Sequence, residues 1–288
     1  MPSLGIDIGG SSVKAVYEDG GTLTTARSAG YTRPSRDELV AAVREALRLL
    51  DAAVDESTPI GLCLPGKQSV AGDRVERSIN LPSLDGWLFS AFLGSVLGFN
   101  PDRYRVVSDV HATAIDIVSR YELAGRVAVI AMGTGVGFAM LEDGEVLRLG
   151  SRGAGHLGQL DVGRCDEHDR FHADGARNTL ESYVGVHGLR EQLGTNDELM
   201  IEDYLRHVSA DDPVMRALVH AMRVVHAIHT PDTIVLVGGV GVALRPGRDL
   251  IHQLVSDGLT SLARPGWELQ FGDSLYHAAS GAARLALR

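Results

Sequence analysis

The feature that most constrains the fold is a strand–glycine turn–strand unit that occurs twice in the chain. In the first copy an apolar run ends at Gly9, and the returning run ends at Glu18-Asp19-Gly20. In the second copy the equivalent positions are Gly133 and Glu142-Asp143-Gly144, so both ends are displaced by the same 124 residues. One such hairpin alone is more often an ordinary surface turn. Because chance seldom keeps both ends of a repeat in step, the sequence predicts one structural unit in each half of the chain.

The remainder of the chain alternates between apolar runs and segments of helical periodicity, which predicts α/β architecture. Buried strands are expected over 59–64, 106–108 and 233–237. A capping box at Ser35 and Glu38 predicts the start of the first helix. Further helices are expected over about 110–124, from Pro213 onward, over 249–262, and over 276–287 at the end of the chain.

The composition is that of an ordinary globular protein, with 288 residues, 44% hydrophobic and 22% charged. The net charge of −10 and the scattered Lys and Arg disfavour a nucleic-acid partner, and argue weakly against a long polyanion as substrate. The two cysteines, Cys63 and Cys165, are too few for a disulfide framework. The chain shows neither a signal-peptide pattern nor an apolar run near the ~20 residues of a membrane span. We therefore expect a cytoplasmic protein without a membrane partner.

The repeated glycine turns have a chemical use. Because glycine has no side chain, the backbone N–H groups of such a turn can approach an anion closely. Two such turns could hold the phosphates of one nucleotide from both sides. Asp7, just before the first turn, could hold Mg²⁺ directly or through water, and Ser12 and Thr134 could add hydroxyl groups. Lys14 either steadies a phosphate or is an exposed strand residue, and the residues leave both interpretations open.

In this order, and over nearly the whole chain, the motifs resemble those of the ROK family of sugar kinases and sugar-responsive repressors, within the actin-like ATPase superfamily. The run Asp7-Ile8-Gly9-Gly10-Ser11-Ser12-Val13-Lys14 resembles the first phosphate motif, and Gly133-Thr134-Gly135-Val136-Gly137 the second. The stretch from Pro231 to Val240 resembles the adenosine motif. The resemblance implies these nucleotide-binding residues: Asp7, Gly9, Gly10, Ser11, Ser12, Lys14, Gly133, Thr134, Gly135, Gly137, Gly238 and Gly239.

The fold that the resemblance implies is an α/β fold of two actin-like (RNase-H-like) lobes, with a cleft between them for Mg-ATP and a small substrate. We expect the N-terminal lobe over residues 1–107, with the last helix, 276–288, packing back on it. The C-terminal lobe is expected over 108–275. Closure of the lobes would exclude water, which otherwise competes as phosphoryl acceptor.

Asp109 is the candidate catalytic base. It stands where a strand ends and a helix begins, and there a carboxylate could accept the proton of a substrate hydroxyl that attacks the γ-phosphorus. From the residues alone, a helix cap is the better interpretation. The Asp that aligns with it is the family's catalytic base, so the resemblance favours the catalytic role.

The sugar-binding positions follow the family only in part. Asn80 and Glu181 match residues that contact the sugar in relatives. His156 stands where the family has a sugar-binding Glu, and Gln159 where it has a His. A histidine can donate a hydrogen bond and a carboxylate cannot, so the change alters specificity, weakens sugar binding, or is drift in a surface loop.

The chain departs from the family at two further positions near Asp109, and the family has Asn at both of them. Ser108 precedes the candidate base and His111 follows it by two residues. With the sugar-binding positions, they leave open which sugar is bound and how much activity remains.

The family's structural zinc site is not expected here. Relatives use a His and three closely spaced Cys, whereas this chain has Gln159, Asn178 and Thr179 in those places. A substitute formed by Cys165, His168 and His172 is conceivable, but the polar stretch 164–174 is better interpreted as a solvated loop. Three further histidines, His220, His226 and His229, fall in one helical stretch, which indicates a solvated or packed helix face rather than metal ligands.

The sequence therefore predicts an ATP-dependent sugar kinase that phosphorylates a hydroxyl, the 6-hydroxyl, of a hexose or hexose derivative. Two alternatives stay open: a catalytically weak or inactive sugar-binding sensor, and polyphosphate in place of ATP as donor. The identity of the sugar also stays open. The repressor branch carries a DNA-binding helix-turn-helix before the first phosphate motif. Because that motif begins at Asp7 here, no such domain is expected. The family resemblance suggests a homodimer.

Overall fold

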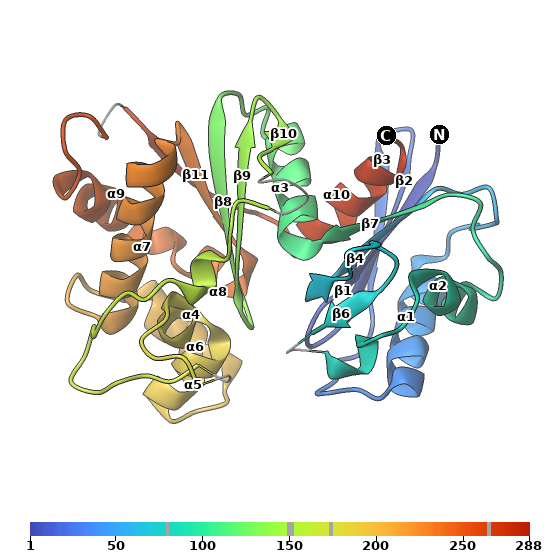
Figure 1. The fold of residues 1–288 in the computed structure, drawn as a ribbon, viewed down its shortest axis with the longest axis horizontal. Coiled ribbons are helices and arrows are strands. Elements are labelled where there is room, and N and C mark those ends of the chain that lie inside the picture. Colours follow the sequence, from blue (N-terminus) through green and yellow to red (C-terminus); the bar gives the residue numbers. More distant parts are fainter. Residues whose placement is uncertain (79–80, 149–152, 173–174, 264–265) are drawn as a thin grey trace. The chain divides into compact units, whose positions relative to one another are not determined.

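The computed structural model describes residues 1–78, 81–148, 153–172, 175–263 and 266–288. The chain divides into two compact units (Figure 1). Unit 1 contains Met1–Ile117 and Tyr276–Arg288, and unit 2 contains Val118–Leu275. Unit 1 extends past the boundary predicted at residue 107, because most of helix α3 (Asp109–Arg120) belongs to it.

The core of unit 1 is a mixed sheet of five strands in the order β3-β2-β1-β4-β7. The first three strands pair antiparallel, and β4 and β7 extend the sheet in parallel. The bounds are β1 (Ser3–Ile8), β2 (Val13–Asp19), β3 (Thr22–Arg27), β4 (Ile60–Leu64) and β7 (Tyr104–Ser108). Two short strands, β5 (Lys67–Gln68) and β6 (Val75–Arg77), pair with each other outside this sheet.

The helices of unit 1 cover this sheet. They are α1 (Arg36–Leu50), the 3₁₀ turn η1 (Pro82–Leu84), α2 (Phe89–Leu97), α3 and α10 (His277–Ala286). The capping box predicted for α1 is confirmed, because the Ser35 hydroxyl accepts the Glu38 amide and the Glu38 carboxylate accepts the Ser35 amide. The buried side of α1, with residues such as Leu39, Val43 and Leu50, joins the apolar core of the sheet.

Unit 2 repeats the sheet of unit 1. Its five strands follow the order β10-β9-β8-β11-β12, and again the first three pair antiparallel and the last two in parallel. The bounds are β8 (Arg126–Met132), β9 (Val136–Glu142), β10 (Glu145–Val146), β11 (Thr233–Val237) and β12 (Glu268–Phe271). The predicted repeat is confirmed, because β1–β2 and β8–β9 are the same hairpin at the same place in two equivalent sheets.

The helices of unit 2 enclose its own core, in which α7 is the longest element (Figure 1). Nine of the seventeen α7 residues are buried. None of the helices in the described ranges is long and apolar enough to cross a membrane. The bounds are η2 (Leu157–Gln159), α4 (Leu180–Val184), α5 (Val186–Leu193), α6 (Glu198–Arg206), α7 (Pro213–His229), α8 (Gly238–Ala243), η3 (Arg245–Gly247) and α9 (Arg248–Asp257).

The last helix, α10, packs against the rest of unit 1 with its backbone in direct contact with neighbouring backbone. A Cβ atom on Gly5 of β1 would lie 1.9 Å from the Ala279 carbonyl oxygen, and one on Gly61 of β4 would lie 1.9 Å from that of Ala282. On the helix itself, a Cβ on Gly281 would lie 1.8 Å from the Ala112 carbonyl oxygen in α3. These glycines are therefore required by close packing, which joins α10 to β1, β4 and α3.

We predict that Gly61→Ala destabilises unit 1 by about 2–3 kcal/mol, because the new methyl group can be accommodated only if α10 moves away from β4. Chemical denaturation measures the change. Gly30→Ala is the matched control, since its Cβ meets only the Ser11 carbonyl oxygen at an ordinary 3.7 Å. Equal stability of the two variants would contradict the close packing of α10.

Candidate functional site

The first glycine turn joins β1 to β2 and is held by hydrogen bonds inside unit 1. The Gly9 amide donates to the Ser12 carbonyl at 3.1 Å, which closes the turn. The Tyr31 hydroxyl donates to the Gly9 carbonyl at 2.6 Å, and the Tyr31 amide donates to the Ser11 carbonyl at 2.9 Å. Gly9 and Gly10 are half-buried and Ser11 is exposed. The turn is thus rigid on one side and open to solvent on the other.

Arg27 is a positively charged residue at this turn that the sequence analysis did not identify. Its Nε donates to the Ser12 Oγ at 3.0 Å, while the residue as a whole is exposed. The β2–β3 register pairs it with Lys14, so two cations lie side by side. Ser12 itself is buried, and its hydroxyl is already engaged by Arg27. The signal that could have found Arg27 is the turn at Gly20-Gly21, after which the chain returns as β3 toward the first glycine turn.

Asp7 and Lys14 form an ion pair across the first hairpin. The Lys14 Nζ lies 3.2 Å from the Asp7 Oδ2, and both side chains are largely buried, at 18% and 7% exposed. The interpretation of Lys14 as an exposed strand residue is therefore wrong. Its positive charge lies beside the Asp7 carboxylate and below the turn, where it compensates a negative charge that is mostly shielded from water.

The carboxyl ends of three parallel strands bring Asp7, Cys63 and Asp109 to one edge of the unit 1 sheet. Asp7 pairs with Cys63, and Cys63 with Val107, two residues before Asp109. Since adjacent strands lie about 4.8 Å apart, the ends of β1 and β7 are separated by roughly 10 Å. Burial and the negative charges of Asp7 and Asp109 raise the pKa of the Cys63 thiol, which keeps it protonated. This edge is where open α/β sheets bind ligands.

Asp109 is the first residue of α3, and its Oδ1 accepts the Val110 amide at 2.8 Å. The poorly hydrated surroundings of its carboxyl group, and then the negative charge of Asp7, raise its pKa to about 6. The residue is nevertheless exposed, so a ligand can reach it. A carboxylate that is accessible and more basic than usual suits proton acceptance near neutral pH. Asp109 therefore has the properties of a base, and its contact with the Val110 amide helps to orient the carboxylate at the start of α3.

Three candidate residues accompany Asp109 in the sequence-based assignment: Ser108, His111 and Asn80. The Ser108 Oγ is buried and has no hydrogen-bond partner within the described part of the chain. His111, two residues further, is half-buried in α3. Asn80, the predicted sugar contact, lies outside the described residues. Ser108 thus leaves one polar atom near the candidate base that a ligand or water could satisfy.

The second glycine turn joins β8 to β9 in unit 2, and Glu181 packs directly against it. The Gly133 amide donates to the Gly135 carbonyl at 2.9 Å, and the Val136 amide donates to the Glu181 Oε2 at 2.7 Å. A Cβ on Gly135 would lie 2.8 Å from the same oxygen. Thr134 is exposed at the tip of the turn, and Gly137 is half-buried at the start of β9. The turn predicted from sequence is present, and Glu181, predicted as a sugar contact, contacts it.

The other predicted positions of unit 2 are spread over two segments. Gly238 follows β11 with φ +81°, and a Cβ there would lie 2.3 Å from the Met132 carbonyl oxygen, so only glycine fits. Gly239 is exposed, and a Cβ there would meet nothing within 4 Å. His156 precedes the 3₁₀ turn η2 and Gln159 is its last residue, and both are exposed. Their side chains are accessible, which agrees with either specificity positions or a surface loop.

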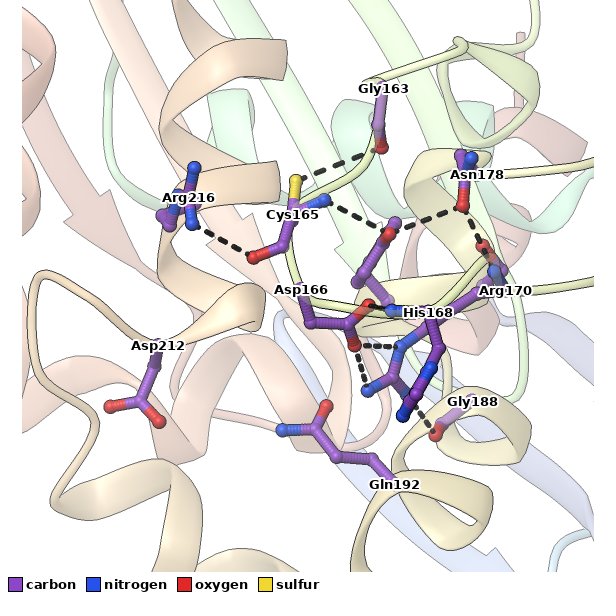
Figure 2. A network of polar contacts seen from close by, with 12 residues as sticks. Gly163, Cys165, Asp166, His168, Arg170, Asn178, Gly188, Gln192, Asp212 and Arg216 are labelled. Atoms are coloured by element: carbon purple, nitrogen blue, oxygen red, sulfur yellow. Dashed lines mark hydrogen bonds and ion pairs between the residues drawn. The ribbon is translucent and has the colours of Figure 1, made fainter.

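The segment in which the family has its zinc site is organised by polar contacts (Figure 2). The Arg170 Nε donates to the Asp166 Oδ2 at 2.7 Å, and its guanidinium lies 5.2 Å from the Tyr183 ring centre. The buried Tyr183 hydroxyl accepts the Cys165 amide at 3.1 Å and donates to the Asn178 Oδ1 at 3.2 Å. The prediction of a solvated loop is wrong for this core of the segment, because charged and aromatic side chains provide the internal contacts.

The candidate zinc substitute does not assemble. Cys165 and His172 are both buried, but His172 pairs with Glu181 rather than with a metal-ligand cluster. In the described ranges no group of three or more His, Cys, Asp or Glu could hold a metal ion. Of the α7 histidines, His226 is buried against Trp267, whereas His220 is exposed.

A magnesium ion that arrives with nucleotide phosphates needs only one or two protein carboxylates. Asp7 fits that requirement by its chemistry, since it is a carboxylate at the end of β1 next to the glycine turn; it is largely buried, and its Oδ2 lies 3.2 Å from the Lys14 Nζ. The donor set is therefore compatible with magnesium bound together with a nucleotide, and not with an ion held by the protein alone.

These features define the class of the protein. Two α/β units with equivalent five-stranded sheets, each with a glycine turn between its first two strands, form the actin-like ATPase fold. The model of the ROK family matches residues 3–286. The chain therefore belongs to the ROK family, as the sequence resemblance predicted.

Solved structures share the fold at low identity. A ROK family glucokinase from Streptomyces griseus in complex with glucose and AMPPNP matches with a TM-score of 0.75 at 17% identity, over 100% of this chain and 99% of that one. A ROK family transcriptional regulator, a homologue of the Escherichia coli MLC protein, matches with 0.75 at 16%, over 99% and 78%. An inorganic polyphosphate/ATP-glucomannokinase from Arthrobacter sp. strain KM matches with 0.66 at 21%, over 99% and 98%. No curated protein matches the sequence.

We predict that Asp7→Asn lowers the pKa of Asp109 from about 6 toward the ~4 of an ordinary aspartate. Removal of the Asp7 charge makes the ionised form of Asp109 easier to reach, so its titration moves to lower pH. Carbon-13 NMR of the labelled carboxyl groups measures the shift. Asp37→Asn, in the first turn of α1, is the control and should leave Asp109 unchanged. An Asp109 pKa that stays the same or rises in Asp7→Asn would contradict the electrostatic account.

Proposed function

We propose that this protein is an ATP-dependent sugar kinase that transfers the γ-phosphoryl group to a hydroxyl, the 6-hydroxyl, of a hexose or hexose derivative. The observation that carries the proposal is Asp109, an accessible carboxyl group of raised pKa at the ligand-binding edge of the unit 1 sheet, beside Asp7 and the first glycine turn. Family membership supports it, because sugar kinases occur among the family's structures.

In the proposed reaction, the Asp109 carboxylate accepts the proton of the sugar hydroxyl. The hydroxyl oxygen bonds to the γ-phosphorus, the bond from that phosphorus to the β–γ bridging oxygen breaks, and ADP leaves. The raised pKa makes Asp109 a better proton acceptor than an ordinary aspartate. Its accessibility lets the substrate hydroxyl come within hydrogen-bond distance.

The phosphates are assigned to the two glycine turns. Backbone amides of residues 10–12 and of Thr134 and Gly135 bind phosphate oxygens, while the amides of Gly9, Gly133 and Val136 hold the turns themselves. Lys14 and the exposed Arg27 add positive charge at the first turn. Asp7 would hold the magnesium ion that comes with ATP, directly or through water. When bound, that ion supplies positive charge that offsets the charge of the transferred group. Gly238 and Gly239 are assigned to the adenosine side of the nucleotide.

The sugar contacts are assigned to Ser108, His156 and Gln159, and family alignment adds Asn80. Glu181 is not assigned to the sugar, because both of its carboxylate oxygens contact groups of the chain itself. The buried Ser108 hydroxyl, which has no hydrogen-bond partner among the residues that the structure describes, supports a polar ligand close to Asp109. The exposed His156 and Gln159 are the positions at which this chain would select a sugar different from that of relatives with Glu and His there.

One observation favours a second candidate, a sugar-binding sensor without turnover. Both carboxylate oxygens of Glu181 contact groups of the chain itself, which reduces its capacity for a sugar. A regulator with the same fold supports this class. A third arrangement, with polyphosphate as donor, uses the same residues.

We predict that wild-type protein releases ADP from ATP in the presence of one or more members of a hexose panel, in a coupled assay. Asp109→Asn should lower kcat at least ~100-fold, because general base catalysis contributes about that factor, while it leaves ADP binding intact. Asp102→Asn, a surface substitution in the same unit, is the control. Turnover of Asp109→Asn close to wild type would make the base assignment wrong. Sugar binding without any turnover would favour the sensor, and turnover with polyphosphate alone would favour the other donor.

We further predict that kcat/KM of the wild type falls as the pH decreases through about 6. Below its pKa Asp109 carries a proton and cannot accept another, whereas above it the carboxylate is ready, so activity should reach a plateau on the alkaline side. The measurement is kcat/KM against pH with the best hexose of the panel. An acid limb near pH 4 would indicate an unperturbed carboxyl group and would contradict the role of the local environment.

A further inference from the structure

Glu181 occupies an unusual place for a sugar ligand, because its carboxylate lies against the second glycine turn. The Glu181 Oε2 accepts the Val136 amide at 2.7 Å, and Cβ atoms on Gly135 and Gly158 would lie only 2.8 and 3.1 Å from the same oxygen. A charged acceptor makes a stronger hydrogen bond to an amide than a neutral one does. The conformation of the turn is therefore tied to the position of one carboxylate oxygen.

The other carboxylate oxygen is also engaged by the chain. The His172 Nε2 lies 2.6 Å from the Glu181 Oε1, and the His172 side chain is only 5% exposed, against 23% for Glu181. At that distance the imidazole donates its N–H to the carboxylate. His172 in turn is held at a bridge between Phe171 and Arg177, where its amide donates to the Ala176 carbonyl at 2.7 Å. Glu181 is thus oriented from both sides.

The charge of Glu181 gives the imidazole a second role. A bare carboxylate below a turn that receives phosphates would repel them, and the loss of water around a half-buried group makes that repulsion stronger. The hydrogen bond that His172 donates to Glu181 offsets part of the negative charge of the carboxylate next to the turn. The pair therefore fixes the geometry of the turn and reduces its electrostatic penalty.

We propose that Glu181 and His172 are a positioning pair that holds the second glycine turn, residues 133–137, in the conformation that binds nucleotide phosphates. This inference rests on the proposed phosphate role of the turn. It reassigns Glu181 from the sugar to the nucleotide, and it gives His172 a function in place of metal binding. The contacts of Asn178 with Arg170 and Tyr183 then brace the segment in which the His172 amide donates to the Ala176 carbonyl.

A second anchor makes the proposal testable without unfolding the unit. The Val186 amide donates to the Gly133 carbonyl at 2.9 Å, so the other end of the turn stays attached when Glu181 is changed. The variants are Glu181→Ala, His172→Ala, the double variant and the conservative Glu181→Gln. The control pair is His187 and Glu191 on α5, which make a similar contact at 3.3 Å but are both more than half exposed.

Two readouts separate a positioning role from a sugar role. Amide hydrogen exchange of the ligand-free protein reports whether Val136 is held, and calorimetry with ADP alone reports whether the turn binds phosphates. We expect both alanine variants to speed exchange at Val136 and to weaken ADP binding about 10-fold. The double variant should be no weaker than Glu181→Ala, because both residues act through one contact, and Glu181→Gln should keep most of the affinity. His187→Ala and Glu191→Ala should change neither, and hexose binding should stay the same throughout.

Several results would overturn the proposal. Unchanged exchange and ADP affinity in Glu181→Ala would remove the positioning role, as would a loss confined to hexose binding. Independent, additive effects of the two substitutions would separate His172 from Glu181. A wild-type protein that binds no ADP would instead overturn the proposed kinase function, while exchange at Val136 would still decide whether the pair holds the turn.

Discussion

The close approach of α10 to the first sheet is the constraint on which the candidate site depends. Glycine at positions 5, 61 and 281 brings the helix backbone directly onto β1, β4 and α3. Those three elements supply Asp7, Cys63 and Asp109, so one helix fixes the relative positions of the groups that set the electrostatics of the site. The raised pKa of Asp109 follows from this packing, because it requires both limited hydration and the charge of Asp7 nearby.

Much of the fold could be predicted because its signals are local. The two hairpins kept a constant offset of 124 residues, and the capping box at Ser35 and Glu38 marked the start of α1. Turn glycines and alternating apolar runs depend on the residues themselves. The two-lobed α/β architecture followed from the resemblance to the family, whereas the order of strands in each sheet came from the structure.

The parts that could not be predicted are contacts between residues distant in sequence. Arg27 reaches Ser12 because β3 folds back on β2, and His172 reaches Glu181 across a bridged segment. Neither contact has a spacing rule. The polar stretch 164–172 was predicted only in part for a similar reason. It is a loop with exposed residues such as Arg164 and His168, but Asp166, Arg170 and Tyr183 also give it an internal network that its polarity does not reveal.

We propose that the protein transfers a phosphoryl group from ATP to a sugar hydroxyl. Phosphorus-31 NMR of wild-type protein with Mg-ATP and a hexose is the decisive test, because it observes the product itself. If transfer occurs, a new phosphomonoester resonance grows in step with ADP. Resonances of ADP and inorganic phosphate alone would show hydrolysis, and an unchanged ATP spectrum with every hexose would show no transfer. Either result would rule out the proposed kinase activity.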